Sequence, residues 1–135
     1  MLNTCAQLFV DDLESKNLNY QSGTSKQGDS VVDFPYEGKI AKMVFSGDKG
    51  EYFSLYIVYD HVHEDKVAEV IYACKEFNAE YKWVTAYVDS DNDLMFHEDA
   101  LLSESNAADE AFELLVRALK IMGEVKPKFM RAIYA

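Results

Sequence analysis

Residues 78–83, NAEYKW, are the point at which a helical pattern of apolar side chains stops and a strand pattern begins. Before this junction the apolar residues recur at the three- and four-residue spacing of one helix face, at Val67, Val70, Ile71, Cys74 and Phe77. After it, residues 82–88 alternate with the two-residue period of a strand. Asn78 stands where the helix is expected to end, and Asn tolerates the left-handed backbone that such a terminus often needs. The junction therefore predicts a helix over 64–78 followed directly by a strand.

The same two periods organise the rest of the chain. Helical spacing predicts helices over 2–17 and from Asn106 to about Val125, and Pro127 is expected to kink the last helix or make it restart. Runs of β-branched and aromatic residues between turn residues predict four more strands, over 30–34, 39–46, 52–59 and 94–97. The polar segment 18–29 is expected to be a loop.

The expected order of elements is therefore α-β-β-β-α-β-β-α. Strands that are mostly joined by tight turns favour one antiparallel sheet, here of about five strands, with the helices largely on one face. We expect an α+β fold. A chain of 135 residues without a repeat or linker fits a single domain over 1–135.

Composition excludes several classes of function. Lys and Arg number 13 against 24 Asp and Glu, and the formal charge of -11 repels the phosphates of nucleic acids and anionic lipids. No apolar segment approaches the roughly 20 residues that cross a bilayer, and Asp11 and Asp12 fall where a signal peptide needs apolar residues. Cys5 and Cys74 lie on apolar helix faces and are expected to be buried and free. These features predict an acidic cytoplasmic protein that binds neither nucleic acid nor membrane.

The C-terminal end is an exception to the acidic balance. From Val116 to Ala135 there are five basic residues and one acidic residue, a net charge of +4. We interpret this excess as a complement to the dipole of a C-terminal helix.

Two clusters have partial metal-site patterns. His61 and His63 place two imidazoles on one face of an extended segment, but the sequence offers no further ligand, so a polar loop is the preferred interpretation. Asp89, Asp91 and Asp93 have the opening spacing of a calcium loop. The sixth and twelfth positions of such a loop require Gly and Glu, which are missing here, so we predict a hairpin turn.

The sequence assembles no catalytic site either. Cys74 lies between apolar neighbours on its helix face, and burial there predicts a raised pKa and a poor nucleophile. The turn Gly47–Gly50 is too short for a phosphate-binding loop. We therefore expect no enzyme activity and no metal ion or cofactor.

Several segments together resemble a known family. Glu64–Val70 running into Phe77–Tyr81, the acidic turn Asp91–Asp93 and the closing segment Pro127–Tyr134 are similar to the YbjN family of small bacterial domains, which resemble the type III secretion chaperones in fold. The resemblance spans nearly the whole chain. It implies a non-enzymatic domain, because secretion chaperones are acidic homodimers that hold a partner along their surface and YbjN proteins are described as signalling or stress regulators. It supplies no catalytic residue, and it implies a structural role for Asn78.

The second face of the sheet is the candidate binding surface. If the aliphatic sets of the third and fourth strands pack under the helices, the opposite face presents Tyr52, Tyr56, Trp83 and Tyr87. Tyr and Trp combine apolar area with a polar tip and are enriched at interfaces. The alternative is that the C-terminal tail covers these residues, or that they form cross-strand pairs on a wet sheet face.

Two functional hypotheses follow. The first is a chaperone-like or regulatory protein-binding module, acting as a homodimer through helix 64–78 or through the aromatic sheet face, and capturing a polypeptide by strand addition or by a helix in a groove. The second is a sensory domain that holds a small ligand in an apolar pocket between the sheet and the C-terminal helix.

Overall fold

A computed structural model describes every residue from 1 to 135. The chain forms three α-helices, six strands and one short 3-10 helix, η1. In chain order these elements are α1 (Thr4–Ser15), β1 (Gln21–Thr24), β2 (Ser30–Tyr36), β3 (Lys39–Ser46), β4 (Tyr52–His61), η1 (Glu64–Lys66), α2 (Val67–Glu80), β5 (Thr85–Val88), β6 (Asp93–Leu101) and α3 (Ala107–Tyr134).

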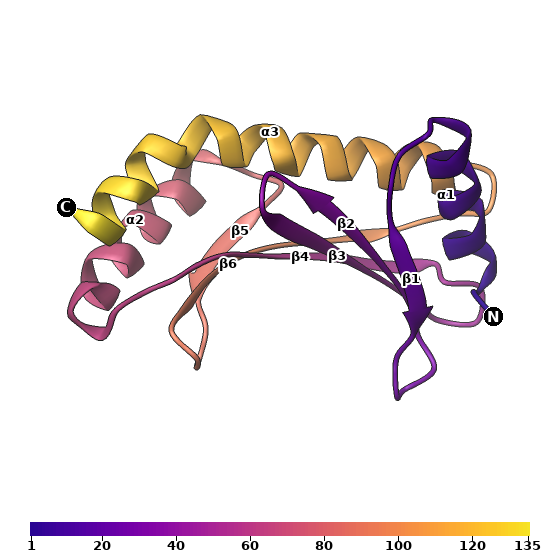
Figure 1. The fold of residues 1–135 in the computed structure, drawn as a ribbon, viewed down its shortest axis with the longest axis horizontal. Helices are drawn as coiled ribbons and strands as arrows, with labels where there is room; N and C mark the ends of the chain where they lie inside the picture. Colours follow the sequence, from indigo (N-terminus) through magenta and orange to yellow (C-terminus); the bar gives the residue numbers. More distant parts are fainter.

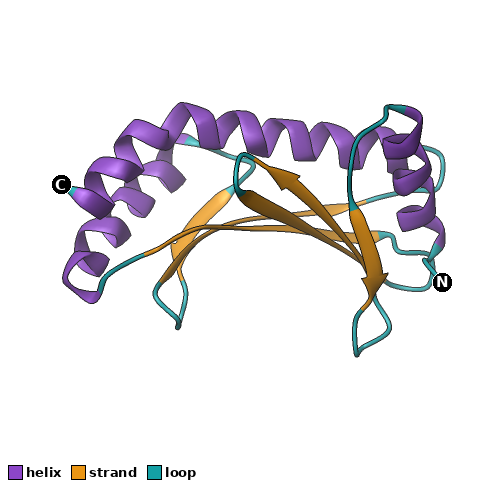
Figure 2. Cartoon of the chain, viewed as in Figure 1, coloured by secondary structure: helices purple, strands orange, loops and turns teal.

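All six strands join one antiparallel sheet in the order β1-β2-β3-β4-β6-β5. The helices lie on one side of this sheet, where α3 runs along its length and packs against α1 near one end and α2 near the other (Figure 1). The opposite side carries no helix, and two hairpin turns project beyond it (Figure 2). The expected α+β fold with helices on one face is confirmed, with six strands instead of about five.

The additional strand, β1, lies within the segment 18–29 that was expected to be a loop. It pairs with β2 so that Gln21 lies opposite Asp33 and Thr24 lies opposite Ser30. All four residues of β1 are exposed. A strand that buries neither face has no reason to alternate apolar and polar residues, so its pairing is not visible in its composition.

The core lies between the sheet and the three helices. Phe53, Leu55 and Ile57 of β4 face the helices and are at most 1% exposed, as expected for the aliphatic side of this strand. Phe96 of β6 packs edge-on against Phe129 of α3, with ring centroids 5.6 Å apart. Edge-to-face aromatic pairs of this kind add specific geometry to the burial of apolar area.

One expected core residue lies outside. Ile71 was placed on the buried stripe of the helix 64–78, but its side chain is 53% exposed. Val70, Ala73, Cys74 and Phe77 are the residues that α2 buries. The helix packs against β5 and α3 with Ala73 inward in place of Ile71, while Val70, Cys74 and Phe77 are buried as expected.

Asn78 has a structural role, but not the expected one. The helix α2 continues past it to Glu80, and Asn78 is not among the residues with positive φ. Its side-chain amide donates to the carbonyl oxygen of Ala86 and accepts from the N–H of Ala86, both at 2.9 Å. The β5 residue Ala86 pairs with Phe96 of β6, so the Asn78 amide bonds to backbone groups on the outer edge of the sheet.

The last helix is not interrupted by Pro127. α3 runs unbroken from Ala107 to Tyr134, so the expected restart is wrong, although Figure 1 shows the helix curving toward its C-terminal end. Proline removes one backbone hydrogen bond, but Val125 before it and Phe129 and Ile133 after it are all buried in the core. Packing on both sides of the proline therefore holds the helix together. Neither this helix nor the other two have the combination of length and apolar composition that crossing a bilayer requires.

Candidate functional site

The candidate site is the face of the sheet that carries no helix (Figure 2). Ladder register aligns Val58 of β4, Met95 of β6 and Tyr87 of β5 in one row across three strands. Ile40 lies next to the pair formed by Ala41 and Ile57, on the same face as Val58. About half of the Ile40 and Val58 side chains is exposed, whereas Met95 is 9% exposed although no helix covers it. An apolar row of this kind on a sheet face is typical of an interaction surface.

An aromatic stack continues this row. The rings of Tyr56 and His97, which are cross-strand partners, are stacked with centroids 4.4 Å apart. The Tyr87 ring lies edge-on to the His97 ring, with centroids 6.4 Å apart. We call the resulting group the open-face cluster; it consists of Ile40, Tyr56, Val58, Tyr87, Met95 and His97.

The cluster borders a polar network centred on Asp99. His97 Nε2 lies 2.8 Å from Asp99 Oδ1, and the Ser54 hydroxyl donates to the same oxygen at 2.6 Å. Partial burial acts to raise the pKa of Asp99, but the hydrogen bonds from Ser54 and His97 outweigh it and lower that pKa. The Ser54 hydroxyl is bonded to the carboxylate and not to the imidazole, and the lowered pKa of Asp99 makes that carboxylate a weaker base. The arrangement holds a charged carboxylate in a fixed position at the rim of the cluster.

The four residues predicted for a binding face do not form one patch. Tyr56 and Tyr87 lie together around His97. Tyr52 is four residues away from Tyr56 along β4, roughly 13 Å, and pairs instead with Leu101. Trp83 precedes β5, which begins at Thr85 and not at 82 as expected. The guanidinium carbon of Arg117 on α3 lies 5.3 Å from the centroid of the Trp83 ring, so Trp83 lies on the helical side of the molecule.

The two histidines of the candidate metal site have separate partners. His61 Nδ1 lies 2.9 Å from Asp93 Oδ1, whereas His63 accepts a hydrogen bond from the N–H of Asp65 and caps η1. The structure brings no third ligand to them. The only three potential ligands within reach of one another belong to the acidic turn 89–93, where the oxygens lie within 4.8 Å.

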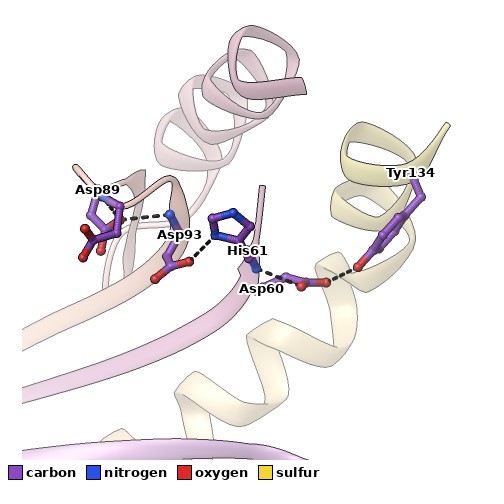
Figure 3. Close-up of polar contacts among 6 residues, drawn as sticks. Asp60, His61, Asp89, Asp93 and Tyr134 are labelled. Atoms are coloured by element: carbon purple, nitrogen blue, oxygen red, sulfur yellow. Dashed lines mark hydrogen bonds and ion pairs between the residues drawn. The ribbon is translucent and has the colours of Figure 1, made fainter. Parts of the chain in front are cut away.

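That acidic turn is a hairpin, as predicted. The carboxylate of Asp89 accepts two backbone hydrogen bonds from within the turn, at 2.9 and 3.0 Å. Figure 3 shows how polar contacts continue from it toward the end of α3: Asp93 pairs with His61, and the Asp60 carboxylate accepts from the His61 N–H and, at 2.6 Å, from the Tyr134 hydroxyl. The acidic side chains are therefore largely engaged in fixing the turn and its neighbours.

Both cysteines are buried and free, as expected. Burial raises the pKa of the Cys74 thiol to about 11, and it also raises the pKa of Cys5. A thiol that stays protonated and is shielded from solvent is a poor nucleophile.

One buried ionisable residue was missed in the sequence. Glu98 of β6 faces the helices, is 4% exposed, and neither of its carboxyl oxygens has a hydrogen-bond partner. Burial raises its pKa to about 7; the nearby Arg117 opposes this effect, and Glu110 and Asp99 add to it. The alternation of β6 contains the signal for this position, because Leu94, Phe96 and Glu98 fall on the same side of a strand.

Comparison with known proteins agrees with the fold. The family model YbjN, described as "Putative bacterial sensory transduction regulator", matches residues 9–124. Among solved structures, the Yersinia pestis type III secretion chaperone SycH, crystallised in complex with a stable fragment of YscM2, is similar with a TM-score of 0.51. That match has 10% sequence identity and covers 86% of this chain and 98% of the SycH chain, so the likeness is one of fold. No curated protein matches the chain at a significant level.

Proposed function

The chain belongs to the YbjN family, and from this premise we propose that it is a non-enzymatic regulatory module that binds a partner polypeptide on its open-face cluster. The observation that carries the proposal is the apolar row formed by Val58, Met95 and Tyr87, which no element of the chain covers. Val58 and its neighbour Ile40 are about half exposed beside the largely buried Met95, and apolar side chains bordered by polar residues on an open face are a feature of protein interfaces. The C-terminal tail, which was one candidate cover, is part of α3 and lies on the other side of the sheet.

The charge of the chain selects the kind of partner. A formal charge of -11 attracts basic polypeptides and speeds their encounter with this surface. Asp99, which the Ser54 and His97 hydrogen bonds keep ionised, places a negative group beside the apolar row. The favoured partner is therefore a segment that combines apolar or aromatic residues with Lys or Arg. The same charge opposes nucleic acid, and two free buried thiols suit the reducing cytoplasm.

Binding across the face is favoured over strand addition at the β5 edge. The outward N–H and C=O of Ala86 on this edge strand are already bonded to Asn78. A peptide that added a strand there would have to displace these bonds. The opposite edge, β1, is exposed but has only four residues.

We also propose that the protein forms a homodimer through the outer face of α2. Ile71 and Tyr72 are 53% and 62% exposed on this helix. Together with Ala68 they occupy one helix face at positions i, i+3 and i+4. Sedimentation equilibrium should detect a dimer of the native chain, and Ile71→Glu should shift it to monomer with unchanged helix content. A native chain that remains monomeric at high concentration would remove this part of the proposal.

Capture by matched variants tests the polypeptide site. Immobilised protein is exposed to a lysate of its own host, and bound polypeptides are quantified by mass spectrometry. The double variant Tyr56→Ala, Tyr87→Ala should lose a defined set of basic polypeptides that the native protein retains. Tyr52→Ala, which truncates the same residue type on the same strand outside the cluster, should retain that set. Equal retention by the double variant, or equal loss by Tyr52→Ala, contradicts a binding site at the cluster.

A further inference from the structure

A separate cavity of about 390 Å³ lies on the helical side, between α3 and the β2–β3 hairpin. Half of its twelve lining residues are hydrophobic, including Tyr59, Met122 and Met130. Its volume is within the range of about 300–1,000 Å³ that holds small organic molecules. The cavity does not overlap the open-face cluster, and nothing in the binding of a polypeptide to that cluster uses it.

A bulge in β4 shapes one wall of the cavity. The register between β4 and β6 shifts between Val58 and Asp60. Because a bulge places one additional residue in its strand, Tyr59 and Asp60 both line the cavity instead of pointing to opposite faces. Asp60 is already engaged, since its carboxylate accepts hydrogen bonds from the His61 N–H and the Tyr134 hydroxyl (Figure 3).

Basic residues outnumber acidic ones on the cavity wall, although the whole chain is acidic. Acidic residues outnumber basic ones by 24 to 13, yet three lysines, Lys39, Lys120 and Lys126, line this cavity beside two carboxylates, Glu37 and Asp60. None of these lysines forms an ion pair. The excess of basic residues near the C-terminus, explained above by the helix dipole, thus includes two that face one cavity.

Lys39 is held in place at this wall. Its ammonium donates to the backbone carbonyl of Tyr59 at 2.6 Å and lies 4.7 Å from the centroid of the Tyr59 ring. An ammonium has three N–H donors, and this contact uses one of them. The other two remain for an anionic group next to an aromatic wall.

Gly123 is an exposed residue at the cavity wall. It lies inside α3 and lines the cavity, and a Cβ built there meets no atom within 4 Å. Glycine inside a helix is unfavourable relative to alanine, and no close contact explains it here. Gly123 also stands four residues before Pro127, so relief of the proline ring is the competing explanation.

We propose that this cavity binds a small organic anion with an apolar body. The anionic group pairs with Lys39, Lys120 and Lys126, and the body packs against Tyr59, Met122 and Met130. This inference is independent of the polypeptide site. It takes up the hypothesis of a ligand held between the sheet and the C-terminal helix, with a wall that is half polar and not apolar.

A pair of fluorescent probes tests the charge requirement. 8-Anilinonaphthalene-1-sulfonate is an amphipathic anion, and N-phenyl-1-naphthylamine is its neutral analogue. We expect one sulfonate site per chain, with an affinity at least about tenfold above that of the neutral probe. The variant Lys120→Met, Lys126→Met should weaken the anion about tenfold and leave the neutral probe within about twofold. The control variant Lys75→Met, Lys82→Met removes two lysines elsewhere and should change the affinity of neither probe. The proposal is overturned if the two probes bind with equal affinity. It is also overturned if Lys120→Met, Lys126→Met leaves the affinity for the anion unchanged.

A second pair of variants tests the location. Gly123→Leu should fill the cavity and abolish binding of both probes, while Gly123→Ala should bind them like the native chain. If Gly123→Leu folds with unchanged helix content and still binds the sulfonate, the cavity is not the site. Octanoate and octyl phosphate, compared with octanol as a neutral control, then distinguish carboxylate from phosphate ligands by displacement of the sulfonate. Displacement by either anion but not by octanol supports the proposal, and equal displacement by octanol overturns it.

Discussion

Replacing Glu98 by Gln should make the protein more stable, by an amount that depends on pH. Glu98 is buried in the core face of β6 without a hydrogen-bond partner for either oxygen. Burial raises its pKa from the ordinary 4.5 to about 7. The charged groups that act on it are Arg117, which opposes the rise, and Glu110 and Asp99, which add to it. Gln has nearly the same shape and a polar end but never ionises.

The sign and size follow from proton linkage. The unfolded chain loses the Glu98 proton near pH 4.5, while the native state keeps it until about pH 7. Between these values the native state binds more protons, so the free energy of unfolding falls as the pH rises, and above about pH 7 the loss is complete. At about 1.4 kcal/mol for each pKa unit, the total loss is roughly 3 kcal/mol. Glu98→Gln should therefore exceed the native chain by less than about 1 kcal/mol near pH 5 and by roughly 3 kcal/mol at pH 8.

Urea unfolding between pH 4.5 and 8.5, followed by circular dichroism, measures this difference. Glu80→Gln at the exposed end of α2 is the control, because it makes the same substitution outside the core. A Glu98→Gln variant whose advantage does not grow with pH, or which is less stable than the native chain at pH 8, would show that the Glu98 carboxylate is satisfied in the native state. The burial reasoning would then be refuted.

Three further substitutions or probes test individual contacts. Asn78→Ala should destabilise the protein by about 1–2 kcal/mol and speed hydrogen exchange at the Ala86 amide, because two hydrogen bonds to Ala86 are lost; an unchanged exchange rate at Ala86 would contradict the edge contact. Cys74, with its thiol pKa raised to about 11 by burial, should react with a disulfide reagent at pH 8 only as the chain unfolds, and rapid reaction of the native protein would contradict its burial. Gly50→Ala should cost about 2 kcal/mol or more in a thermal melt, because Gly50 has a φ of 80° and a Cβ would collide with the Asn3 side chain that caps α1; a melting temperature equal to that of the native chain would contradict this packing.

Local periodicity was sufficient for the fold class. The stretch 78–83 separates a helix from a strand in the structure as in the sequence, and the aliphatic side of β4 faces the helices as expected. The failures occurred where partners decide the outcome. β1 pairs through its backbone and buries neither face, so its residues contain no alternation to detect. Ile71 fits the apolar stripe of its helix, but packing against β5 and α3 buries Ala73 in its place.

The candidate site was partly predictable for a related reason. Alternation placed Tyr56 and Tyr87 on the same face of the sheet, and the structure brings them together around His97. It could not show that Trp83 lies outside the strand and turns toward Arg117, because that depends on where β5 begins. The stacking of His97 on Tyr56 depends on the register between β4 and β6. The periodicity within one strand does not predict that register.

Site-specific photo-crosslinking is the most direct measurement of where a partner binds. p-Benzoylphenylalanine in place of Tyr87 puts the reactive group in the open-face cluster, and the same residue in place of Glu14 on α1 puts it on an exposed position of the helical side. After irradiation in the host cells, we expect position 87 to form a discrete adduct with a basic polypeptide, which Tyr56→Ala reduces, and position 14 to form none. Absence of an adduct at position 87, or an adduct at position 14 with the same polypeptide and equal yield, would contradict binding on the open sheet face.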